Sequence, residues 1–474
     1  MVSPPPLSLA SGGLSFPRFF IRSGSAAALA SSPASRGGGG GGGRGSRAMA
    51  TPEAARACLA SFLRDFPRPL GPDEALPWSP PGRGGAALRQ AEAPAELAES
   101  GRAFLSSRNV PPLLAASLIH AAISDLLRAD LNEFQKHSVE EEEAGDHGAS
   151  PLLDGGPLQR CFFNKLWDVC GKWQKQLPIL KPLERYLQIS VHATRNSRRK
   201  MEDRHVCLLE FNQLFGMTDN MDRAYFAVFD GHGGIDAANY AATHLHVNVA
   251  NHKEFLTNPG EALREAFEKT DEMFLSKARR EKLRSGSTGV AALIVGNKLH
   301  IAWLGDSQVM LVQKGKTVTL MEPHKPERED ERQRIEALGG CVTYMDCWRV
   351  NGTLAVSRAI GDLLQKPYIS GCADGASAEL TGAEDYVLLA CDGFFDAIQP
   401  FEVVDHVLEH LMQSKGDGLK TAESLVAAAK ESGSTDNITV LVAFLREPKE
   451  IMADCLRDPK SCLADDISSS ETNN

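Results

Sequence analysis

The sequence lacks the features that mark several large classes of protein. No apolar run approaches the ~18 residues that a membrane-spanning helix needs, so the chain is not expected to cross a membrane. Basic residues are not in excess: 51 Lys and Arg stand against 61 Asp and Glu, and the net charge of −10 argues against a nucleic-acid binder. The ten cysteines include no CxxC pair, a spacing typical of zinc sites, so we expect reduced thiols.

Residues 1–50 contain no acidic residue and no lysine, but they carry five arginines and a glycine run from Gly37 to Gly43. Such a segment cannot bury enough apolar surface to offset its chain entropy, which predicts a disordered leader. An Arg- and Ser-rich, acid-free composition is also that of a mitochondrial transit peptide. Because the glycine run does not suit an amphipathic helix, we expect a cytosolic protein, with mitochondrial import or a second start at Met49 as alternatives.

Residues 51–154 are predicted to form a helical region that regulates the protein or binds partners. Apolar residues from Leu114 to Leu127 recur at helical spacing after Pro112, which indicates an amphipathic helix. A second apolar stripe, from Phe162 to Leu177, is expected to dock this region onto the unit that follows. We set that unit at 155–447 and expect a flexible polar tail at 448–474.

From about residue 186 the pattern changes to short apolar strands and tight turns. Strands at 291–295 and 299–304, and again at 309–312 and 318–320, are separated by turn residues and predict hairpins. Helices are expected between the strands, at 261–277, 330–338, 401–413 and 421–431. The order predicts an α+β fold: an antiparallel β-sandwich flanked by α-helices and preceded by the helical region.

Acidic residues recur at the ends of these strands. Each instance alone is weak, because Asp-Gly after a strand is ordinary turn chemistry. A sandwich nevertheless brings strand ends together, and two unit charges ~4 Å apart repel by roughly 4 kcal/mol at an effective dielectric constant of ~20. A crowded set of acids therefore predicts a hard divalent cation, Mg²⁺ or Mn²⁺. The acids concerned are Glu202, Asp203, Asp230, Asp306, Asp392, Asp396 and Asp436.

The chain resembles the metal-dependent, type 2C Ser/Thr protein phosphatases in six ordered motifs, at 198–203, 230–234, 305–307, 354–362, 391–396 and 434–437. The resemblance covers 186–445 and implies hydrolysis of phosphoserine and phosphothreonine in proteins by a metal-bridging hydroxide. It is strongest to the branch that acts on calmodulin-dependent and p21-activated kinases and binds PIX exchange factors. An alternative is a catalytically minor scaffold that binds PIX-type factors through the helical region. A two-metal nuclease conflicts with the acidic net charge.

The resemblance also implies which residues hold two Mg²⁺ or Mn²⁺ ions. Asp230 bridges both ions. One ion is also served by the backbone carbonyl of Gly231 and, through water, by Glu202, and the other by Asp392 and Asp436.

Further roles follow from the same resemblance. Asp306 and Asp396 match the acids that hold a third, weaker ion together with Asp392. Arg198 matches the phosphate-binding arginine of the family. Arginine suits this role because its guanidinium offers a fixed fork of donors to a phosphoryl group. His232 matches the general acid, and Asp203 a supporting acid.

Two further expectations concern the 354–362 motif and its surroundings. Arg358 and Asp362 are expected to form a structural ion pair with each other. Residues 323–380 resemble the flap-like insertion of the same family, which implies that they lie beside the active site and shape substrate choice.

Overall fold

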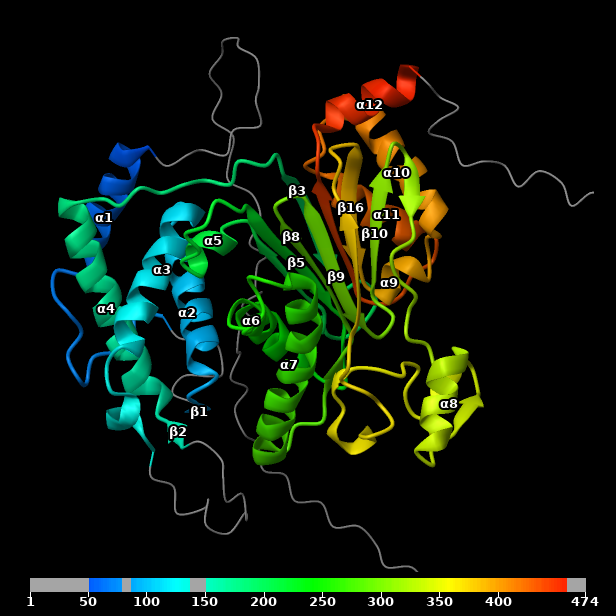
Figure 1. The fold of residues 1–474 in the computed structure, drawn as a ribbon, viewed down its shortest axis with the longest axis horizontal. Coiled ribbons are helices and arrows are strands. Elements are labelled where there is room, and N and C mark those ends of the chain that lie inside the picture. Colours follow the sequence, from blue (N-terminus) through cyan, green and yellow to red (C-terminus); the bar gives the residue numbers. More distant parts are fainter. Residues whose placement is uncertain (1–50, 79–86, 137–150, 458–474) are drawn as a thin grey trace, which may run out of the picture. The chain divides into compact units, whose positions relative to one another are not determined.

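Two five-stranded antiparallel sheets form the centre of the protein (Figure 1). The computed structural model describes residues 51–78, 87–136 and 151–457, so the leader expected at 1–50 lies outside the described residues. One sheet has the order β11 (Lys316–Val318), β10 (Gln308–Gln313), β16 (Glu384–Ala390), β17 (Ile438–Phe444) and β3 (Gln188–Thr194). The other has the order β15 (Asp374–Glu379), β9 (Lys298–Leu304), β8 (Gly289–Val295), β5 (Arg223–Phe229) and β4 (Arg204–Leu208).

The strand periodicity of two explains how the sheets pack. Strand β5 is buried along its whole length. Phe226 and Val228 belong to the apolar core between the two sheets, whereas the alternating residues Tyr225 and Phe229 pack in the core shared with helices. The predicted α+β sandwich is confirmed, and so is the hairpin β8–β9. The second hairpin forms between β10 and β11, but its second strand lies at 316–318 instead of the predicted 318–320.

Helices cover the outer faces of both sheets. Helices α6 (Asp236–Ala250) and α7 (Pro259–Glu281) lie on the second sheet, and α9 (Asp392–Phe395), α10 (Pro400–Gln413) and α11 (Thr421–Glu431) contribute to the core on the first. The chain then forms α12 (Pro448–Arg457), within the stretch where a flexible tail was expected. This helix is ordered because Ile451 and Cys455 are buried in the core that also contains α10. The rest of the expected tail, 458–474, lies outside the described residues.

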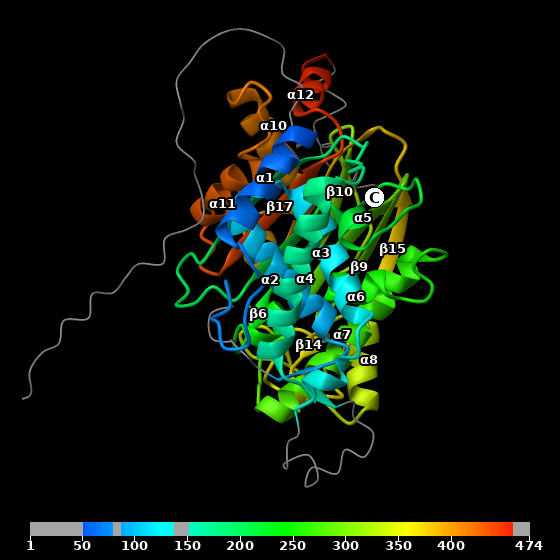
Figure 2. The ribbon, with the colours of Figure 1, turned by 90° about the vertical axis from the view of Figure 1, so that its left-hand side faces the viewer.

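The helical region is built from α1 (Pro52–Asp65), α2 (Ala93–Ser107), α3 (Pro112–Leu127) and α4 (Gly155–Lys175), and Figure 2 looks onto these helices. Short elements join them: β1 (Leu88–Arg89), β2 (Leu152–Leu153) and the 3₁₀ turn Leu131–Phe134. The boundary placed at residue 155 assigned α4 to the following unit. The structure corrects this, because α4 packs against α1 and α3, and its Phe162, Phe163 and Leu166 belong to the core that also contains residues of those helices.

The helical region also shares its core with the sandwich. Helix α2 packs on α6, and α3 packs on the short helix α5 (Phe211–Leu214). The buried Tyr240 of α6 donates a hydrogen bond from its hydroxyl to Glu92 Oε1, at 2.9 Å. The expected docking surface is therefore a continuous apolar core. Among the described helices, none combines the length and apolar composition needed to cross a bilayer.

Two small sheets flank the strand ends that carry the motifs. Residues from three distant segments form β6 (Gly231–His232), β7 (Gly286–Ser287) and β14 (Ile360–Gly361). The insertion after residue 323 contains α8 (Glu329–Ala337) and the hairpin of β12 (Val342–Tyr344) and β13 (Trp348–Val350).

Candidate active site

The motif residues meet in one cleft of about 580 Å³ at the ends of the central strands. Asp230 directly follows β5, Asp392 begins α9 after β16, and Asp436 lies just before β17. Asp306 follows β9, so four separate strands deliver carboxylates to one place. The predicted site residues that line the cleft are Arg198, Glu202, Asp230, Gly231, His232, Asp306, Asp392 and Asp436.

Two predicted residues lie outside the cleft lining. The side chain of Asp396 is 68% exposed and lies 3.9 Å from Lys325 Nζ. Asp203 is buried, and its Oδ2 accepts a hydrogen bond of 2.7 Å from Thr439 Oγ1. Its other oxygen, Oδ1, is buried without a hydrogen-bond partner among the described residues. Asp203 therefore sits beneath the site, whereas Asp396 lies at its exposed edge.

The carboxylates at the bottom of the cleft repel one another. Burial and then the charge of Asp392 raise the pKa of Asp230 well above its ordinary value. Burial and the charge of Asp392 likewise raise the pKa of Asp306 to about 7. Carboxylate oxygens of Asp230 and Asp392 lie within 4.8 Å of each other, together with the thiol of Cys391. Among the described residues, no ion pair neutralises Asp230, Asp306 or Asp392.

This donor set fits divalent cations. Mg²⁺ and Mn²⁺ prefer carboxylate, carbonyl and water oxygens, which is what these strand ends present. Burial and mutual repulsion raise the pKa of Asp230 and Asp306, and a bound cation would offset both effects by stabilising the charged carboxylates. The unpaired Oδ1 of Asp203 adds a buried acceptor beside the same set. The residues therefore suit the two-ion site implied by the sequence motifs.

Glycines allow the strand ends to approach one another. A Cβ atom on Gly231 would lie 2.5 Å from the carbonyl oxygen of Glu202, and one on Gly393 would lie 2.1 Å from that of Asn437. Both distances are shorter than the closest approach of a carbon and an oxygen atom that are not bonded to each other. Any side chain at Gly231 or Gly393 would therefore push apart the segments that carry the acids.

Arg198 lies at the mouth of the cleft, where its guanidinium pairs with Asp436 Oδ2. Its side chain is 61% exposed, so the guanidinium is accessible from solvent. The hydrogen bond and charge of Asp436 raise the pKa of Arg198 further. A permanently charged, planar donor group at this position suits a phosphoryl dianion.

Asn437 is a site residue that the sequence interpretation missed. Its side-chain oxygen accepts a hydrogen bond from the backbone N–H of Glu202 at 2.8 Å, and its amide donates to the carbonyl oxygens of Arg195 and Lys200. Asn437 thus fastens the loop that carries Arg198 to the strand end that carries Asp436. Its position directly after the aspartate of the 434–437 motif could have identified it as a site residue from the sequence.

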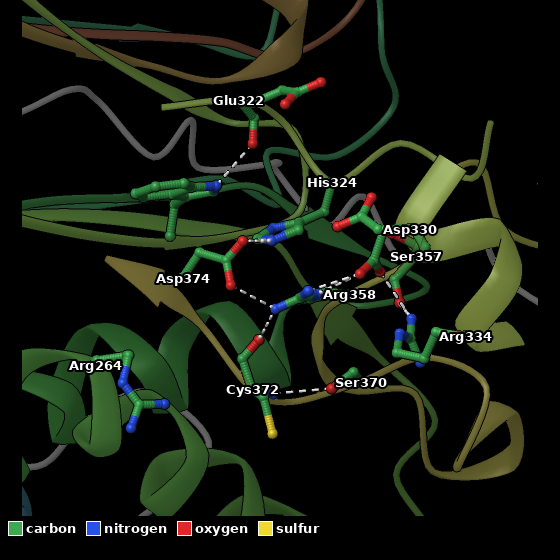
Figure 3. A network of polar contacts seen from close by, with 12 residues as sticks. Arg264, Glu322, His324, Asp330, Arg334, Ser357, Arg358, Ser370, Cys372 and Asp374 are labelled. Atoms are coloured by element: carbon green, nitrogen blue, oxygen red, sulfur yellow. Dashed lines mark hydrogen bonds and ion pairs between the residues drawn. The ribbon is translucent and has the colours of Figure 1, made fainter. Parts of the chain in front are cut away.

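The structure also corrects the pairing expected for Arg358 and Asp362. Arg358 Nη2 lies 2.6 Å from Glu331 Oε1 and its Nη1 lies 2.9 Å from Asp374 Oδ1, as Figure 3 shows for Asp374. Asp362 instead lies 2.8 Å from Nε2 of His232. Burial alone would lower the pKa of His232, but the hydrogen bond and charge of Asp362 raise it above its ordinary value.

The network around Arg358 anchors the insertion to the sandwich (Figure 3). His324 Nε2 lies 2.9 Å from Asp374 Oδ2, and the backbone N–H of His324 donates to the carbonyl of Gly305 at 2.8 Å. Gly305 directly precedes Asp306. The insertion is therefore tied to the strand end that carries one of the clustered acids, and its Arg349, Leu354, Ala355 and Val356 line the cleft.

Comparison with known proteins agrees with this geometry. Residues 187–438 match the family model described as "Protein phosphatase 2C". The chain is 59% identical to human "Protein phosphatase 1F" over 401 residues, which cover 83% of this chain and 88% of the relative. It is 53% identical to mouse "Protein phosphatase 1E" over 339 residues, which cover 72% of this chain and 45% of the relative.

Among solved structures, the fold is similar to that of a protein titled "Structure of a C.elegans sex determining protein". The TM-score is 0.63 at 22% sequence identity, and the match covers 86% of this chain and 97% of the other. At this identity the likeness concerns the fold alone. Its coverage extends beyond the residues of the family model into the helical region.

Proposed function

The chain belongs to the protein phosphatase 2C family, a metal-dependent family of protein serine/threonine phosphatases, and we propose that the cleft around Asp230 is its catalytic site. One observation carries this assignment. Four strand ends bring Asp230, Asp306, Asp392 and Asp436 into one cleft, and the first three have no ion-pair partner among the described residues. Such a cluster of ionised acids is stable only with cations among them, because otherwise the acids take up protons.

The proposed ligands are Asp230, Gly231, Asp392 and Asp436, with Glu202 acting through water and Asp306 and Asp396 serving a third, weaker ion. When bound, two divalent cations lower the pKa of water toward neutrality and screen the charge of a phosphoryl group. The protein's own contribution is to hold the acids in place through the strand ends and through Asn437.

Arg198 and His232 are proposed to act on the phosphate ester itself. Arg198 pairs with Asp436 at the cleft mouth, and an incoming dianion would take over its donors. His232 lines the same cleft and is proposed to donate a proton to the departing seryl or threonyl oxygen. General acid catalysis of this kind contributes roughly 10²–10⁴-fold.

A more specific proposal concerns the substrates, and it is based on the sequence motifs. We infer that the phosphatase acts in the cytosol on phosphorylated calmodulin-dependent and p21-activated kinases and docks PIX exchange factors. Arg199, Lys200 and Arg349 line the cleft beside Arg198, which favours phosphosites with acidic neighbours. The alternative is a scaffold role in which α1–α4 bind partner proteins. In that case a catalytically inactive variant would still bind those partners.

The test is hydrolysis of kinase activation-loop phosphothreonine peptides by residues 1–474 with Mg²⁺ or Mn²⁺. We expect EDTA to abolish turnover and added metal to restore it. Asp230→Asn should lose at least ~10³-fold in kcat, because a lost ligand removes the metal-dependent step. Asp65→Asn, a change of an exposed acid on α1 far along the chain, is the control. Turnover that persists after metal stripping would contradict the proposal, whereas normal cellular behaviour of Asp230→Asn would support the scaffold.

A further inference from the structure

We propose that Asp362 is a positioning residue that holds the imidazole of His232 in the orientation needed for proton donation. The inference rests on the proposed function and adds to it a carboxylate that binds neither metal nor substrate. Asp362 Oδ2 lies 2.8 Å from His232 Nε2, and the Asp362 side chain is 6% exposed. A charged carboxylate accepts hydrogen bonds only, so Nε2 carries a proton.

This contact leaves the other ring nitrogen for catalysis. With Nε2 held by Asp362, Nδ1 of His232 is the ring atom available to the leaving oxygen in the cleft. In the reaction, the oxygen of water forms the new bond to phosphorus and loses its proton to solvent. The bond from phosphorus to the seryl or threonyl oxygen breaks. That oxygen keeps the electron pair and takes the Nδ1 proton, and the ring regains a proton from solvent.

The backbone is built to bring these two side chains together. His232 of β6 and Gly361 of β14 both pair with Gly286 of β7 in the small three-stranded sheet. A Cβ atom on Gly286 would lie 2.1 Å from Asp362 Oδ2 and 2.4 Å from His232 Nε2. The glycine therefore creates the space in which the two side chains meet.

Asp362 also adopts an uncommon backbone conformation. Its φ of 48° and ψ of 46° lie in the left-handed region, which costs free energy for a residue other than glycine. The neighbouring segment is held in place by Asp271, whose Oδ1 accepts a hydrogen bond of 2.7 Å from the N–H of Gly361. A strained conformation that is held from several sides and directs a carboxylate to one imidazole indicates positioning.

The left-handed conformation also selects the test variants. Asparagine tolerates this conformation as well as aspartate does, and glycine tolerates it better, so Asp362→Asn and Asp362→Gly keep the backbone while they remove the charge. Two substrates separate the roles. A phosphothreonine peptide needs a proton on its leaving oxygen, whereas p-nitrophenyl phosphate releases a phenolate that is stable without one.

For both variants we expect kcat on the phosphothreonine peptide to fall by ~10–100-fold, part of the effect of general acid catalysis. Mg²⁺-dependent hydrolysis of p-nitrophenyl phosphate should change by less than ~3-fold, because that step does not use the general acid. His232→Gln should show the same substrate pattern. Asp362→Asn combined with His232→Gln should lose no more than His232→Gln alone, because the two residues act as a unit.

Asp271→Asn is the matched control, since it changes a buried carboxylate of α7 that contacts Gly361 and Lys366 instead of His232. We expect it to affect both substrates equally. Equal losses on both substrates in Asp362→Asn and Asp362→Gly, or additive losses in the double variant, would overturn the positioning role. Metal-independent turnover of p-nitrophenyl phosphate by the unchanged enzyme would instead overturn the proposed function.

Discussion

At the scale of single residues, Asn437 offers a direct test of how the cleft is held together. Asn437→Ala removes three hydrogen bonds that join the Arg198 loop to the strand end carrying Asp436. We expect the free energy of unfolding to fall by about 2–3 kcal/mol, because the backbone groups lose buried partners. The KM for a phosphothreonine peptide should rise by ~10-fold, since Arg198 loses its fixed position.

Urea unfolding and steady-state kinetics measure both effects. Asn251→Ala, at the exposed C-terminal end of α6, is the control and should leave stability and KM within error. An unchanged KM in Asn437→Ala would show that the loop holds Arg198 without this anchor.

The residue scale is also where the sequence was most informative about the site. The acids, Arg198 and His232 could be located because each sits in a short motif at a strand end. The partner of Asp362 could not, because it is 130 residues away in the chain and the pairing depends on the small sheet that brings the segments together. Arg358, the charged neighbour in the same motif, was the nearest partner in sequence but binds Glu331 and Asp374 instead.

At the scale of elements, the insertion depends on an ion-pair network with a defined pH range. Glu331 is 1% exposed, and Arg358 and Arg334 each donate to it. Burial alone would raise the pKa of Glu331, but the hydrogen bonds from Arg358 and Arg334 lower it from 4.5 to about 2. A carboxyl group whose pKa is lower in the folded state than in the unfolded state stabilises the fold at pH values above its unfolded-state pKa. This stabilisation is lost as the pH falls through the folded-state pKa.

Glu331→Gln should therefore cost about 3 kcal/mol of unfolding free energy at pH 7, since Arg334 loses its carboxylate partner and Arg358 keeps only Asp374 among the described residues. The difference between the two proteins should shrink as the pH falls from 4.5 to 2, where Glu331 itself becomes protonated. Urea unfolding at several pH values measures this. Glu336→Gln, at an exposed position of the same helix, is the control. A difference that stays constant down to pH 2 would show that the charge of Glu331 does not stabilise the insertion.

Helix α4 provides a second test at this scale. Phe162 is fully buried and its ring lies 5.4 Å from that of Phe163. Phe162→Ala should lower the unfolding free energy by about 3–5 kcal/mol, because it removes a large buried ring and leaves a cavity. Thermal unfolding followed by circular dichroism measures the change. Leu127→Ala, 42% exposed on α3, is the control, and an equal loss in both proteins would contradict a packed α3–α4 interface.

The sequence predicted elements well where the pattern was long. The stripe of α4 and the strands of the hairpin β8–β9 extend over enough residues to be recognised, whereas β11 has three residues and was placed two residues too late. The strands β6, β7 and β14 have two residues each, too few for any alternation to appear. Helix α12 was missed because only Ile451 and Cys455 mark its buried side, and the burial depends on α10.

At the scale of the whole molecule, the helical region and the sandwich share one apolar core. Removal of residues 1–177 would uncover the face of α6 that holds Tyr240 and the apolar residues of α5. We expect the shortened chain to lose more than ~10 °C in Tm, because each lost kcal/mol shifts Tm by ~2–4 °C in a domain of this size. It should also bind more 1-anilinonaphthalene-8-sulfonate than the full chain.

Differential scanning calorimetry and dye fluorescence test this expectation, with removal of 1–50 alone as the control. That shorter deletion keeps every core residue in the described part of the chain, so it should leave Tm unchanged. A 178–474 chain with the Tm of the full protein would show that α1–α4 are dispensable for folding.

Gly286 has a consequence for how functional positions are recognised. It offers no side chain to substrate or metal, yet a single added methyl group would collide with both His232 and Asp362. A saturation scan scored by phosphatase activity should therefore rank this position with the metal ligands, although a survey of reactive side chains would pass over it. Gly286 thus contributes to the site through the space that it leaves for two other side chains.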